Sequence, residues 1–241
     1  MNPIRALSLT IGYELDALEP VISRETVLYH LVQHHRDCYE RTAALVRGTD
    51  LEALPLESLV QFAARHPGNR YLSALASEAW SHDLYWQSLR PGGGGRPWGL
   101  IDEGIRQSFG TFAAFEQCTK VKARSLLGSG WLWVTWNSGR IQVMTTSPGE
   151  SPVARGNFPL LAIDLWEHAY YLDYYAGRTA YVAACLHELV DWGCANARLT
   201  DLAKHRDAVR RGISWLACGA STTPRGQASV QETATTRFEP T

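Results

Sequence analysis

Residues 164–171 read Asp-Leu-Trp-Glu-His-Ala-Tyr-Tyr, and they directly follow the short apolar run Leu-Leu-Ala-Ile at residues 160–163. The apolar run predicts a strand, so Asp164 lies at a strand end. His168 follows four residues later, which is one turn if the chain becomes helical. A carboxylate and an imidazole placed in this way can converge on one metal ion. The stretch therefore predicts a strand-to-helix junction and part of a metal site.

Other histidines are candidates for the rest of such a site. His30 and His34 are four residues apart, so in a helix they share one face. His82 lies in a second helical segment, and two antiparallel helices can bring it beside His30. Three imidazoles and one carboxylate suit iron or manganese as well as zinc. A single histidine on an amphipathic helix is more often a packed or capping residue, so each one alone carries little weight.

The N-terminal part of the chain predicts a long helical hairpin. Apolar residues recur at three- and four-residue spacing over residues 16–47, and residues 71–89 show a second helical pattern. The sequence His-Pro-Gly-Asn at residues 66–69 predicts a turn between them. Two helices joined in this way pack as an antiparallel pair.

The pattern changes in the second half of the chain. Residues 101–127 predict one or two helices, interrupted near Gly110. Residues 131–136 are aromatic and β-branched, Asn-Ser-Gly at 137–139 predicts a hairpin turn, and residues 141–146 predict the returning strand. With the strand at 160–163, these segments form a small three-stranded antiparallel sheet. Helices are expected to resume at about Trp166, over residues 178–192 and over residues 198–216.

Four consecutive glycines between Pro91 and Pro97 mark a boundary, because such a segment continues neither a helix nor a strand. We expect a helical-hairpin domain at residues 1–90, a Pro/Gly linker at 91–97 and an α+β domain at 98–217. Residues 218–241 are polar with few apolar positions, which predicts a disordered tail. The fold class is therefore α+β, a helical hairpin followed by a domain with a small sheet.

The composition is that of a globular protein, and the charge balance argues against nucleic-acid binding and membrane-surface binding. The 241 residues carry 23 Lys+Arg against 24 Asp+Glu, a formal net charge of −1. Nucleic-acid and membrane-surface proteins need a basic excess, so neither partner is expected. The five cysteines have no CxxC spacing, and the N-terminal residues show no leader pattern. We therefore expect a cytoplasmic protein in a reducing compartment.

Four separated motifs resemble, in the same order, those of the iron/manganese superoxide dismutase family, and the resemblance runs from about residue 13 to residue 216. These motifs are Tyr29-His30 with His34-His35, His82-Asp83-Leu84-Tyr85-Trp86, Gly128-Ser129-Gly130-Trp131-Leu132-Trp133, and residues 163–171. The resemblance implies one iron or manganese ion per chain, held by His30, His82, Asp164 and His168 together with one solvent molecule. It also implies that Trp131, Trp133 and Trp166 wall the cavity.

The resemblance further implies a homodimer. Glu167 would bond across the interface to His168 of the partner subunit, and Tyr171 would meet the partner's His34. Arg178 would lie near the mouth of the substrate funnel. The alternative for Glu167, Tyr171 and Arg178 is a solvated helix face.

Three positions near the implied metal depart from the family pattern. Cys38 stands where the family has a tyrosine at the cavity mouth, and Ser81 replaces an asparagine. Glu78 stands where iron-type members have a glutamine that hydrogen-bonds the metal-bound solvent, and Gly149 stands where manganese-type members supply it. An ionised Glu78 can only accept hydrogen bonds, and it repels an anionic substrate.

Two other states of Glu78 remain open at this point. A protonated Glu78 could still donate a hydrogen bond, and a Glu78 turned inward could itself bind the metal and close the site. The positions of Glu78 and Trp80 follow the iron-type layout, so iron is favoured over manganese.

The resemblance implies superoxide dismutase activity, in which the metal converts superoxide to O2 and H2O2. A second hypothesis keeps the metal site but redirects it to oxidation or oxygenation of a small phenol- or quinone-like molecule, because Cys38 would widen the cavity mouth. A third hypothesis is a metal-binding structural paralogue without activity.

Overall fold

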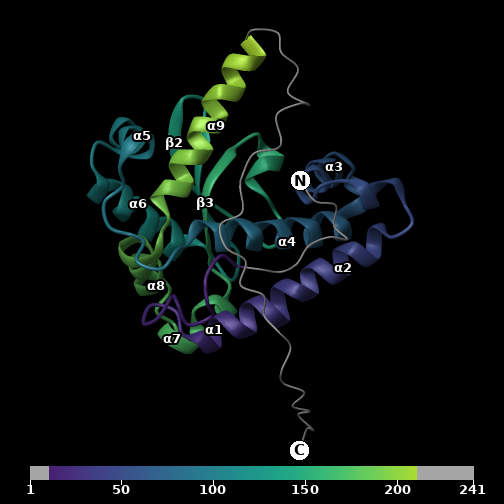
Figure 1. Ribbon diagram of the computed structural model, residues 1–241, viewed down its shortest axis with the longest axis horizontal. Coiled ribbons are helices and arrows are strands. Elements are labelled where there is room, and N and C mark those ends of the chain that lie inside the picture. Colours follow the sequence, from purple (N-terminus) through teal and green to yellow (C-terminus); the bar gives the residue numbers. More distant parts are fainter. Residues whose placement is uncertain (1–10, 211–241) are drawn as a thin grey trace, which may run out of the picture.

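The computed structural model describes residues 11–210, in which helices surround a three-stranded antiparallel sheet (Figure 1). The predicted α+β fold class is confirmed. The expected helix end near residue 216 and the expected tail at 218–241 lie outside the described residues. Within residues 11–210, no helix is both long and apolar enough to cross a membrane.

The N-terminal part is helical and is built mainly from two long segments that lie side by side. Its helices are α1 (Arg24–Leu28), the π-helix η2 (Tyr29–His35), α2 (Arg36–Val46), the 3-10 helix η3 (Asp50–Ala53), α3 (Leu56–Arg65), the 3-10 helix η4 (Pro67–Asn69) and α4 (Arg70–Ser88). The helical hairpin is formed by the continuous run from α1 to α2 and by α4, which packs against α2.

The first helix begins at Arg24, so the expected start near residue 16 is wrong. Ser23 has an extended backbone, and its hydroxyl accepts a hydrogen bond from the Thr26 N–H at 3.2 Å, which caps the first turn. The preceding residues form turns, and Pro20 keeps Glu19 out of the helical conformation.

The hairpin prediction also missed α3, which lies between the two long helices. Its buried residues are Leu56, Leu59, Val60 and Ala63. This spacing of three, four and seven residues is the pattern of one apolar helix face. That face packs against α4. The predicted turn at residues 66–69 follows α3 as the short helix η4.

The second part contains the sheet and the remaining helices. Its elements are α5 (Gly99–Phe109), α6 (Phe112–Ser125), β1 (Trp131–Asn137), β2 (Arg140–Thr146), η5 (Pro152–Arg155), β3 (Phe158–Asp164), η6 (Glu167–Ala169), α7 (Tyr171–Tyr174), α8 (Arg178–Ala184), the π-helix η7 (Cys185–Leu189) and α9 (Trp192–Arg210). The predicted break at Gly110 is confirmed, with φ +80° at this residue. The last helix begins at Trp192 rather than residue 198, because its first turn caps on Asp191.

The sheet has the order β2-β1-β3, with β1 in the centre and antiparallel to both neighbours. Trp131 at the start of β1 pairs with Asp164 at the end of β3. This register fixes the carboxylate beside a tryptophan that is fully buried. The helix expected at Trp166 is instead the 3-10 turn η6, followed by the single turn of α7.

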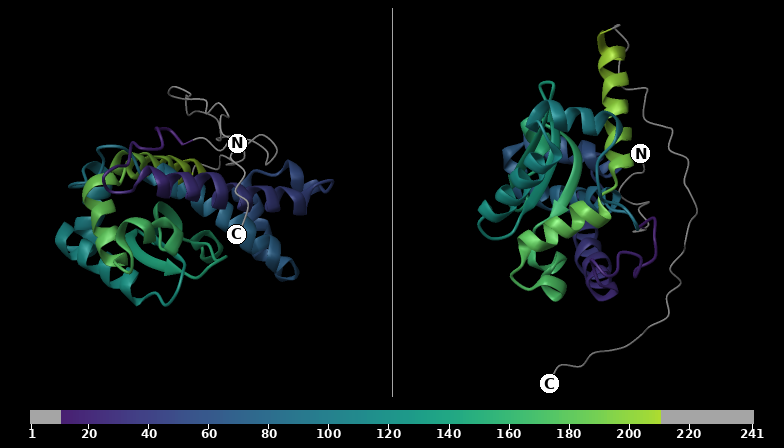
Figure 2. Two further views of the ribbon diagram at one scale, coloured as in Figure 1. Left: turned by 90° about the horizontal axis from the view of Figure 1, so that it is seen from below. Right: turned by 90° about the vertical axis from the view of Figure 1, so that its left-hand side faces the viewer.

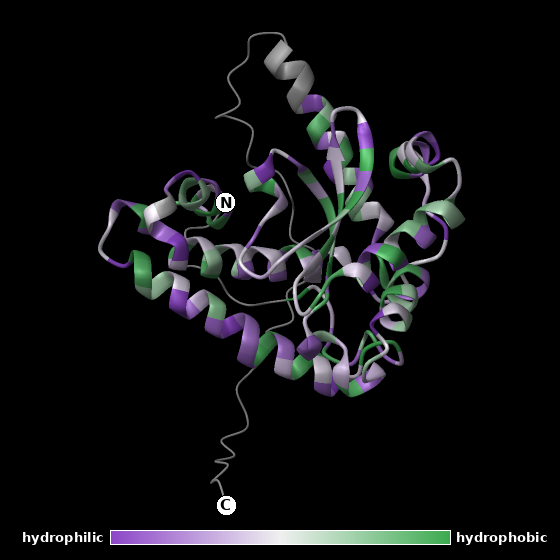
Figure 3. Ribbon diagram, turned by 180° about the vertical axis from the view of Figure 1, so that it is seen from behind, coloured by the Kyte–Doolittle hydropathy of each residue, from purple (hydrophilic) through white to green (hydrophobic). Residues whose placement is uncertain are grey.

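Helices α4 and α9 pack against β3, while α5 and α6 pack against β2. In the left view of Figure 2, α9 and the run from α1 to α2 lie above the strands. The strands carry mainly hydrophobic residues, whereas α2 shows several hydrophilic residues along its length (Figure 3). The apolar core between these layers therefore surrounds the end of β3, where Asp164 lies.

The glycine-rich segment at residues 91–97 is packed rather than free. The Gly94 N–H donates to the Val190 carbonyl and the Gly95 N–H donates to the His187 carbonyl, both at 2.8 Å. A Cβ atom at Gly94 would lie 2.1 Å from the backbone nitrogen of Glu188. Only glycine allows the backbone to approach the end of η7 this closely.

Candidate metal centre

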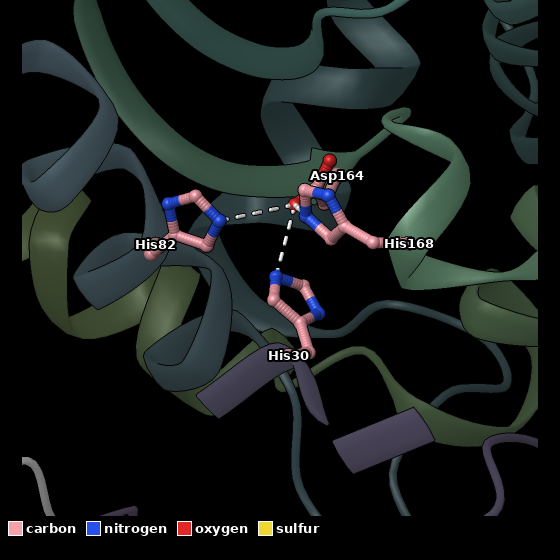
Figure 4. A group of neighbouring side chains, drawn as sticks. All are labelled: His30, His82, Asp164 and His168. Carbon is pink, nitrogen blue, oxygen red and sulfur yellow. Dashed lines mark hydrogen bonds and ion pairs between the residues drawn. The ribbon is translucent and has the colours of Figure 1, made fainter. Parts of the chain in front are cut away.

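Three histidine side chains surround one carboxylate at the junction of the two parts of the chain (Figure 4). The Nε2 atoms of His30, His168 and His82 lie 3.1, 3.2 and 3.5 Å from Oδ2 of Asp164. His30 comes from η2, His82 from α4, Asp164 from the end of β3 and His168 from η6. The structure thus brings together all four residues that the resemblance implied.

The same four residues offer ligand atoms that all lie within 4.8 Å of one another. The side chains of His30, His82 and Asp164 are fully buried, and that of His168 is 24% exposed. Nε2 of both His30 and His82 is buried without a hydrogen-bond partner, although each lies near the carboxylate. A buried nitrogen with no partner is costly unless a ligand satisfies it. Three imidazoles and one carboxylate fit an iron or manganese ion.

The buried histidines are held neutral, which is the form that binds a metal. Burial lowers the pKa of His30 to about 4 and the pKa of His82 well below its usual value, and the Asp164 carboxylate only partly opposes this. Burial acts to raise the pKa of Asp164, but His168 and His30 together hold that pKa far below its usual range. Asp164 is therefore held as an anion beside the neutral rings of His30 and His82.

A backbone hydrogen bond fixes the orientation of His82. Its Nδ1–H donates to the Glu78 carbonyl one turn earlier on α4, at 2.7 Å. Because a carbonyl only accepts, Nδ1 carries the hydrogen and the lone pair of Nε2 faces Asp164. The helix thus selects the tautomer that metal binding requires.

The π-helix η2 changes how the three histidines of the first helix are arranged. His30 and His35 are each 1% exposed, whereas His34 is half-buried. The rings of His30 and His34 both contact His82 and His168, as the expected common face requires. A π turn adds a residue per turn, so His35 points inward as well. The rings of His34 and His168 lie 4.1 Å apart between centroids, so His34 borders the exposed side of the cluster.

Cys38 lies beside His34, with Sγ 4.0 Å from its Nε2. The thiol is buried, and burial raises the pKa of Cys38 to about 12, so it stays protonated at neutral pH. His34, Cys38 and His82 also form a second close group of possible ligand atoms. His82 contributes Nε2 to the Asp164 cluster and uses Nδ1 for Glu78, so this second group retains only two available ligands.

The Glu78 carboxylate is held by two N–H donors. Oε2 accepts from Trp131 Nε1 at 3.0 Å, and Oε1 accepts from the Gly149 backbone N–H at 2.6 Å. Burial raises the pKa of Glu78 to about 7, and the Gly149 N–H opposes that rise. Glu78 is not among the residues whose ligand atoms lie close together. The structure therefore does not show Glu78 turned inward to close the site.

Tryptophans surround the cluster on several sides. The Trp131 ring meets the His82 ring edge to face at 4.8 Å, Trp133 lies 5.8 Å from Trp131, and Trp166 stacks on His168 at 5.7 Å. Trp133 donates its N–H to the Thr146 hydroxyl, whereas the buried N–H of Trp166 has no partner in the described part of the chain.

Sequence reasoning did not single out His35 and its partners as part of the site. The His35 ring stacks on His82 with 5.1 Å between centroids, Trp86 donates to its Nδ1 and its Nε2 donates to the Ala79 carbonyl. Nε2 also lies 3.5 Å from Asp83. The sequence signal was the His34-His35 pair, and only the π turn shows that the second histidine also faces inward.

The residues implied at the dimer interface and the funnel are Glu167, Tyr171 and Arg178, of which Glu167 directly precedes His168. Glu167 is exposed, its backbone carbonyl accepts from the Tyr170 N–H at 3.1 Å, and its carboxylate has no hydrogen-bond or ion-pair partner within the described residues. Tyr171 is 47% exposed. The Arg178 guanidinium donates to the carbonyls of Leu126 and Gly128 at 2.8 and 2.6 Å. Arg178 therefore ties the end of α6 to the loop that leads into β1.

Comparison with known proteins gives the same assignment for both parts of the chain. The alpha-hairpin domain of the iron/manganese superoxide dismutases matches residues 8–90, and the C-terminal domain of that family matches residues 97–198. A Synechocystis protein named superoxide dismutase (Fe) is 38% identical over 78% of this chain and 95% of its own length.

Other similar proteins carry related names. One from Legionella pneumophila, named superoxide dismutase (Fe), is 39% identical over 78% of this chain and 96% of its own length. One from Rickettsia bellii, named superoxide dismutase (Mn/Fe), is 33% identical over 79% of this chain and 91% of its own length. The chain belongs to the iron/manganese superoxide dismutase family, and the expectation of a metal-dependent oxidoreductase is confirmed.

Proposed function

We propose that this protein is a superoxide dismutase in which His30, His82, Asp164 and His168 hold one metal ion per chain. The observation that carries the proposal is the convergence of three imidazole Nε2 atoms on Asp164, two of them buried without a hydrogen-bond partner. Membership of the family supports the same activity. Two superoxide ions and two protons give one O2 and one H2O2.

A bound redox-active metal would supply the electron exchange, oxidising one superoxide and reducing the next. The protein supplies the cage and the charge that control this exchange. Asp164 contributes one negative charge, and the neutral histidines contribute none, so a divalent or trivalent ion keeps a net positive charge that attracts an anion. The buried side chains exclude bulk water and strengthen that attraction.

Superoxide is proposed to reach the cluster past His34 and His168. His168 is the only member of the four-residue cluster with an exposed side chain, at 24%, and the half-buried His34 ring lies beside it. Trp131 covers the cluster at His82 with Trp133 behind it, and Trp166, which stacks on His168 and lies 5.9 Å from His34 between ring centroids, borders the proposed path. His34 and the protonated Cys38 thiol are then the residues nearest to the path along which protons arrive. Arg178 is proposed to line the outer funnel.

Glu78 is proposed to act on the metal-bound solvent through its charge. Its two oxygens accept from Trp131 and Gly149, so in the ionised form the carboxylate offers no hydrogen to a bound hydroxide. We expect this residue to slow the reaction of an anionic substrate compared with a neutral amide at the same position.

A homodimer is proposed for the assembly. Glu167 is exposed next to His168, and Tyr171, Leu172 and Tyr175 are exposed beside it on or after α7. In the proposed dimer, Glu167 bonds to His168 of the partner subunit and Tyr171 meets the partner's His34. A carboxylate on the second nitrogen of a ligating histidine fixes its tautomer and raises its basicity.

Iron is proposed in preference to manganese, and the cytoplasm is proposed as the location. Glu78 and Trp80 occupy α4 in the iron-type layout, and two of the three relatives described above carry iron alone in their names. The proposed domains are residues 1–90 and 98–217, with the linker 91–97 between them and a tail at 218–241. The scarcity of paired cysteine spacings supports a reducing compartment.

The direct test is reconstitution. The purified protein is stripped of metal, divided into three samples, and loaded with iron, with manganese or with neither. Superoxide consumption is then measured per bound ion. The proposal predicts no activity without metal and the highest activity with iron. Equal inactivity of all three samples, with metal bound in the first two, overturns it.

A further inference from the structure

A second set of aromatic residues leads away from the metal cluster. The Tyr85 ring stacks on the His30 ring, with 5.2 Å between centroids and 25° between planes. The Tyr85 hydroxyl lies 3.0 Å from that of Tyr181, and both side chains are fully buried. The pair thus connects a candidate metal ligand on η2 with helix α8.

The same set continues from Tyr181 towards the surface. The Tyr181 ring lies 5.3 Å from Tyr170 and 5.7 Å from Tyr174, between centroids. Such separations, in the range of roughly 4.5–7 Å, are those of rings in contact. Tyr170 is buried, whereas Tyr174 on α7 is half-buried and donates its hydroxyl hydrogen to the Val21 carbonyl. Tyr174 is therefore the end of the set that reaches solvent.

The hydroxyl groups of this set have no role in the dismutase reaction proposed above. A phenylalanine would fill the same core volume at Tyr85 and Tyr181 without placing two hydroxyls in an apolar interior. Cys185, whose buried thiol lies at the start of the π-helix η7, follows Tyr181 by four residues, which is about one helical turn. Two oxidisable phenols thus share one buried hydrogen bond, a thiol lies one turn away, and the Tyr85 ring of the pair stacks on His30.

We propose that Tyr85 and Tyr181 form a relay that carries oxidising equivalents from the metal centre to Tyr174, which is a second redox site at the protein surface. The inference rests on the proposed function for its metal and its hydrogen peroxide. The rings in contact pass electrons, and the hydroxyl pair allows a proton to move between Tyr85 and Tyr181 as the charge moves. Tyr174 is half-buried, and its phenolic hydrogen, which is donated to the Val21 carbonyl before oxidation, passes to solvent once the ring has lost an electron.

The relay acts when hydrogen peroxide, the product of the proposed reaction, meets the reduced centre. Peroxide takes up two electrons and two protons, its O–O bond breaks and two water molecules leave. One electron comes from the reduced metal and the other comes from Tyr174. Tyr174 also loses its phenolic proton, the second proton comes from solvent, and a neutral tyrosyl radical remains. A one-electron donor in solution, such as a small phenol, restores the tyrosine by returning one electron and one proton.

The test uses the full chain loaded with reduced iron and mixed with hydrogen peroxide. Rapidly frozen samples are examined by electron paramagnetic resonance, and a nitroso spin trap followed by peptide mass spectrometry locates the radical. We expect a tyrosyl signal and trap adducts on Tyr174. Tyr181→Phe keeps the ring but removes the hydroxyl, so it should lower the Tyr174 adduct severalfold and increase oxidation of His30 or Trp131.

Tyr13→Phe is the matched control, because its hydroxyl donates to the Trp86 carbonyl outside the relay. It should behave like the parent. Tyr174→Phe should remove the adduct from α7, and it keeps the test decisive if Tyr181→Phe does not fold. Metal content and superoxide consumption are measured on every sample. The relay alone is overturned if the parent is metal-loaded and active but forms no radical on Tyr174. It is also overturned if Tyr181→Phe and Tyr13→Phe give equal adducts. A parent that binds no metal overturns both proposals.

Discussion

The backbone N–H of Gly149 donates to Oε1 of Glu78 at 2.6 Å, although the two residues are 71 positions apart. These are the two positions at which the family resemblance implies a glutamine. Gly149 has φ +75°, and a Cβ atom there would lie 2.9 Å from the Cβ of Ala74. A side chain at Gly149 would thus be strained and crowded, and Gly149 contributes its backbone N–H to the contact with Glu78.

Glu78→Gln is expected to raise superoxide consumption per bound metal. The amide offers a hydrogen that the ionised carboxylate lacks, and it removes a negative charge that repels superoxide. One of the two N–H donors, Trp131 or Gly149, loses its acceptor, so the free energy of unfolding should fall by about 1–3 kcal/mol. Stopped-flow superoxide consumption and urea unfolding measure the two effects.

Cys38→Tyr is expected to add to the gain from Glu78→Gln, because a phenol at this position restores a proton donor beside His34. The double variant is compared with both single variants at equal metal content. If the parent already dismutates well and neither change alters the rate, our explanation of these two positions is wrong. A metal-loaded double variant that stays inactive would instead favour oxidation of a small organic molecule.

Asp164→Ala or His82→Ala is expected to reduce bound metal to a small fraction of the parent level. Each change removes one of four ligands, and in the Asp164 variant three imidazoles lose the charge that they surround. His66→Ala is the control, since His66 is exposed at the end of α3. Elemental analysis after purification measures the metal bound per chain. If either variant binds as much metal as the parent, the replaced residue is not a metal ligand.

Glu167→Ala is expected to weaken both dimerisation and metal retention. The exposed carboxylate is proposed to reach the second ring nitrogen of the partner's His168, so its loss removes an interface bond and a support for a ligand. Glu103→Ala on α5 serves as the control for loss of an exposed carboxylate. Sedimentation velocity and metal analysis report the two effects, and a metal-loaded monomer in the parent protein would defeat the dimer model.

The stability of the metal-free protein is expected to fall as the pH falls below about 6.5. Burial lowers the pKa of His35 from its usual 6.5 to about 3. Between these two pH values the unfolded chain binds a proton at His35 that the folded chain does not bind. The stabilising effect is complete above pH 6.5 and decreases towards pH 3, by about 1.4 kcal/mol per pH unit for each such histidine.

Urea unfolding of the metal-free protein between pH 7 and pH 5 measures this slope. His35→Gln removes one titrating ring, so its slope should be shallower than that of the parent, whatever its absolute stability. His30 and His82 also have lowered pKa values and continue to contribute in both proteins. Identical slopes would show that His35 does not titrate between the folded and unfolded states.

The sequence predicted the parts of the fold that have a local or family pattern. The Asn-Ser-Gly hairpin turn and the break at Gly110 are local signals, and both are confirmed. The meeting of His30, His82, Asp164 and His168 came from the family motifs rather than from spacing, because the residues lie on four separate elements.

Features that depend on packing were missed. The π turn of η2 gives His35 an inward position that a regular α-helix would not, and no residue in this stretch indicates it. The contact of Glu78 with Gly149 depends on how α4 approaches the loop after β2. Pairing of distant segments in this way follows from tertiary structure, and a single sequence does not encode it in any short motif.

The most direct test of the central claim is metal analysis and superoxide consumption on one purified sample. The four-residue cluster predicts about one iron or manganese ion per chain, and superoxide consumption that rises in proportion to metal content. A folded protein that binds no metal at this cluster, or a fully loaded protein that leaves superoxide unchanged, would contradict the account.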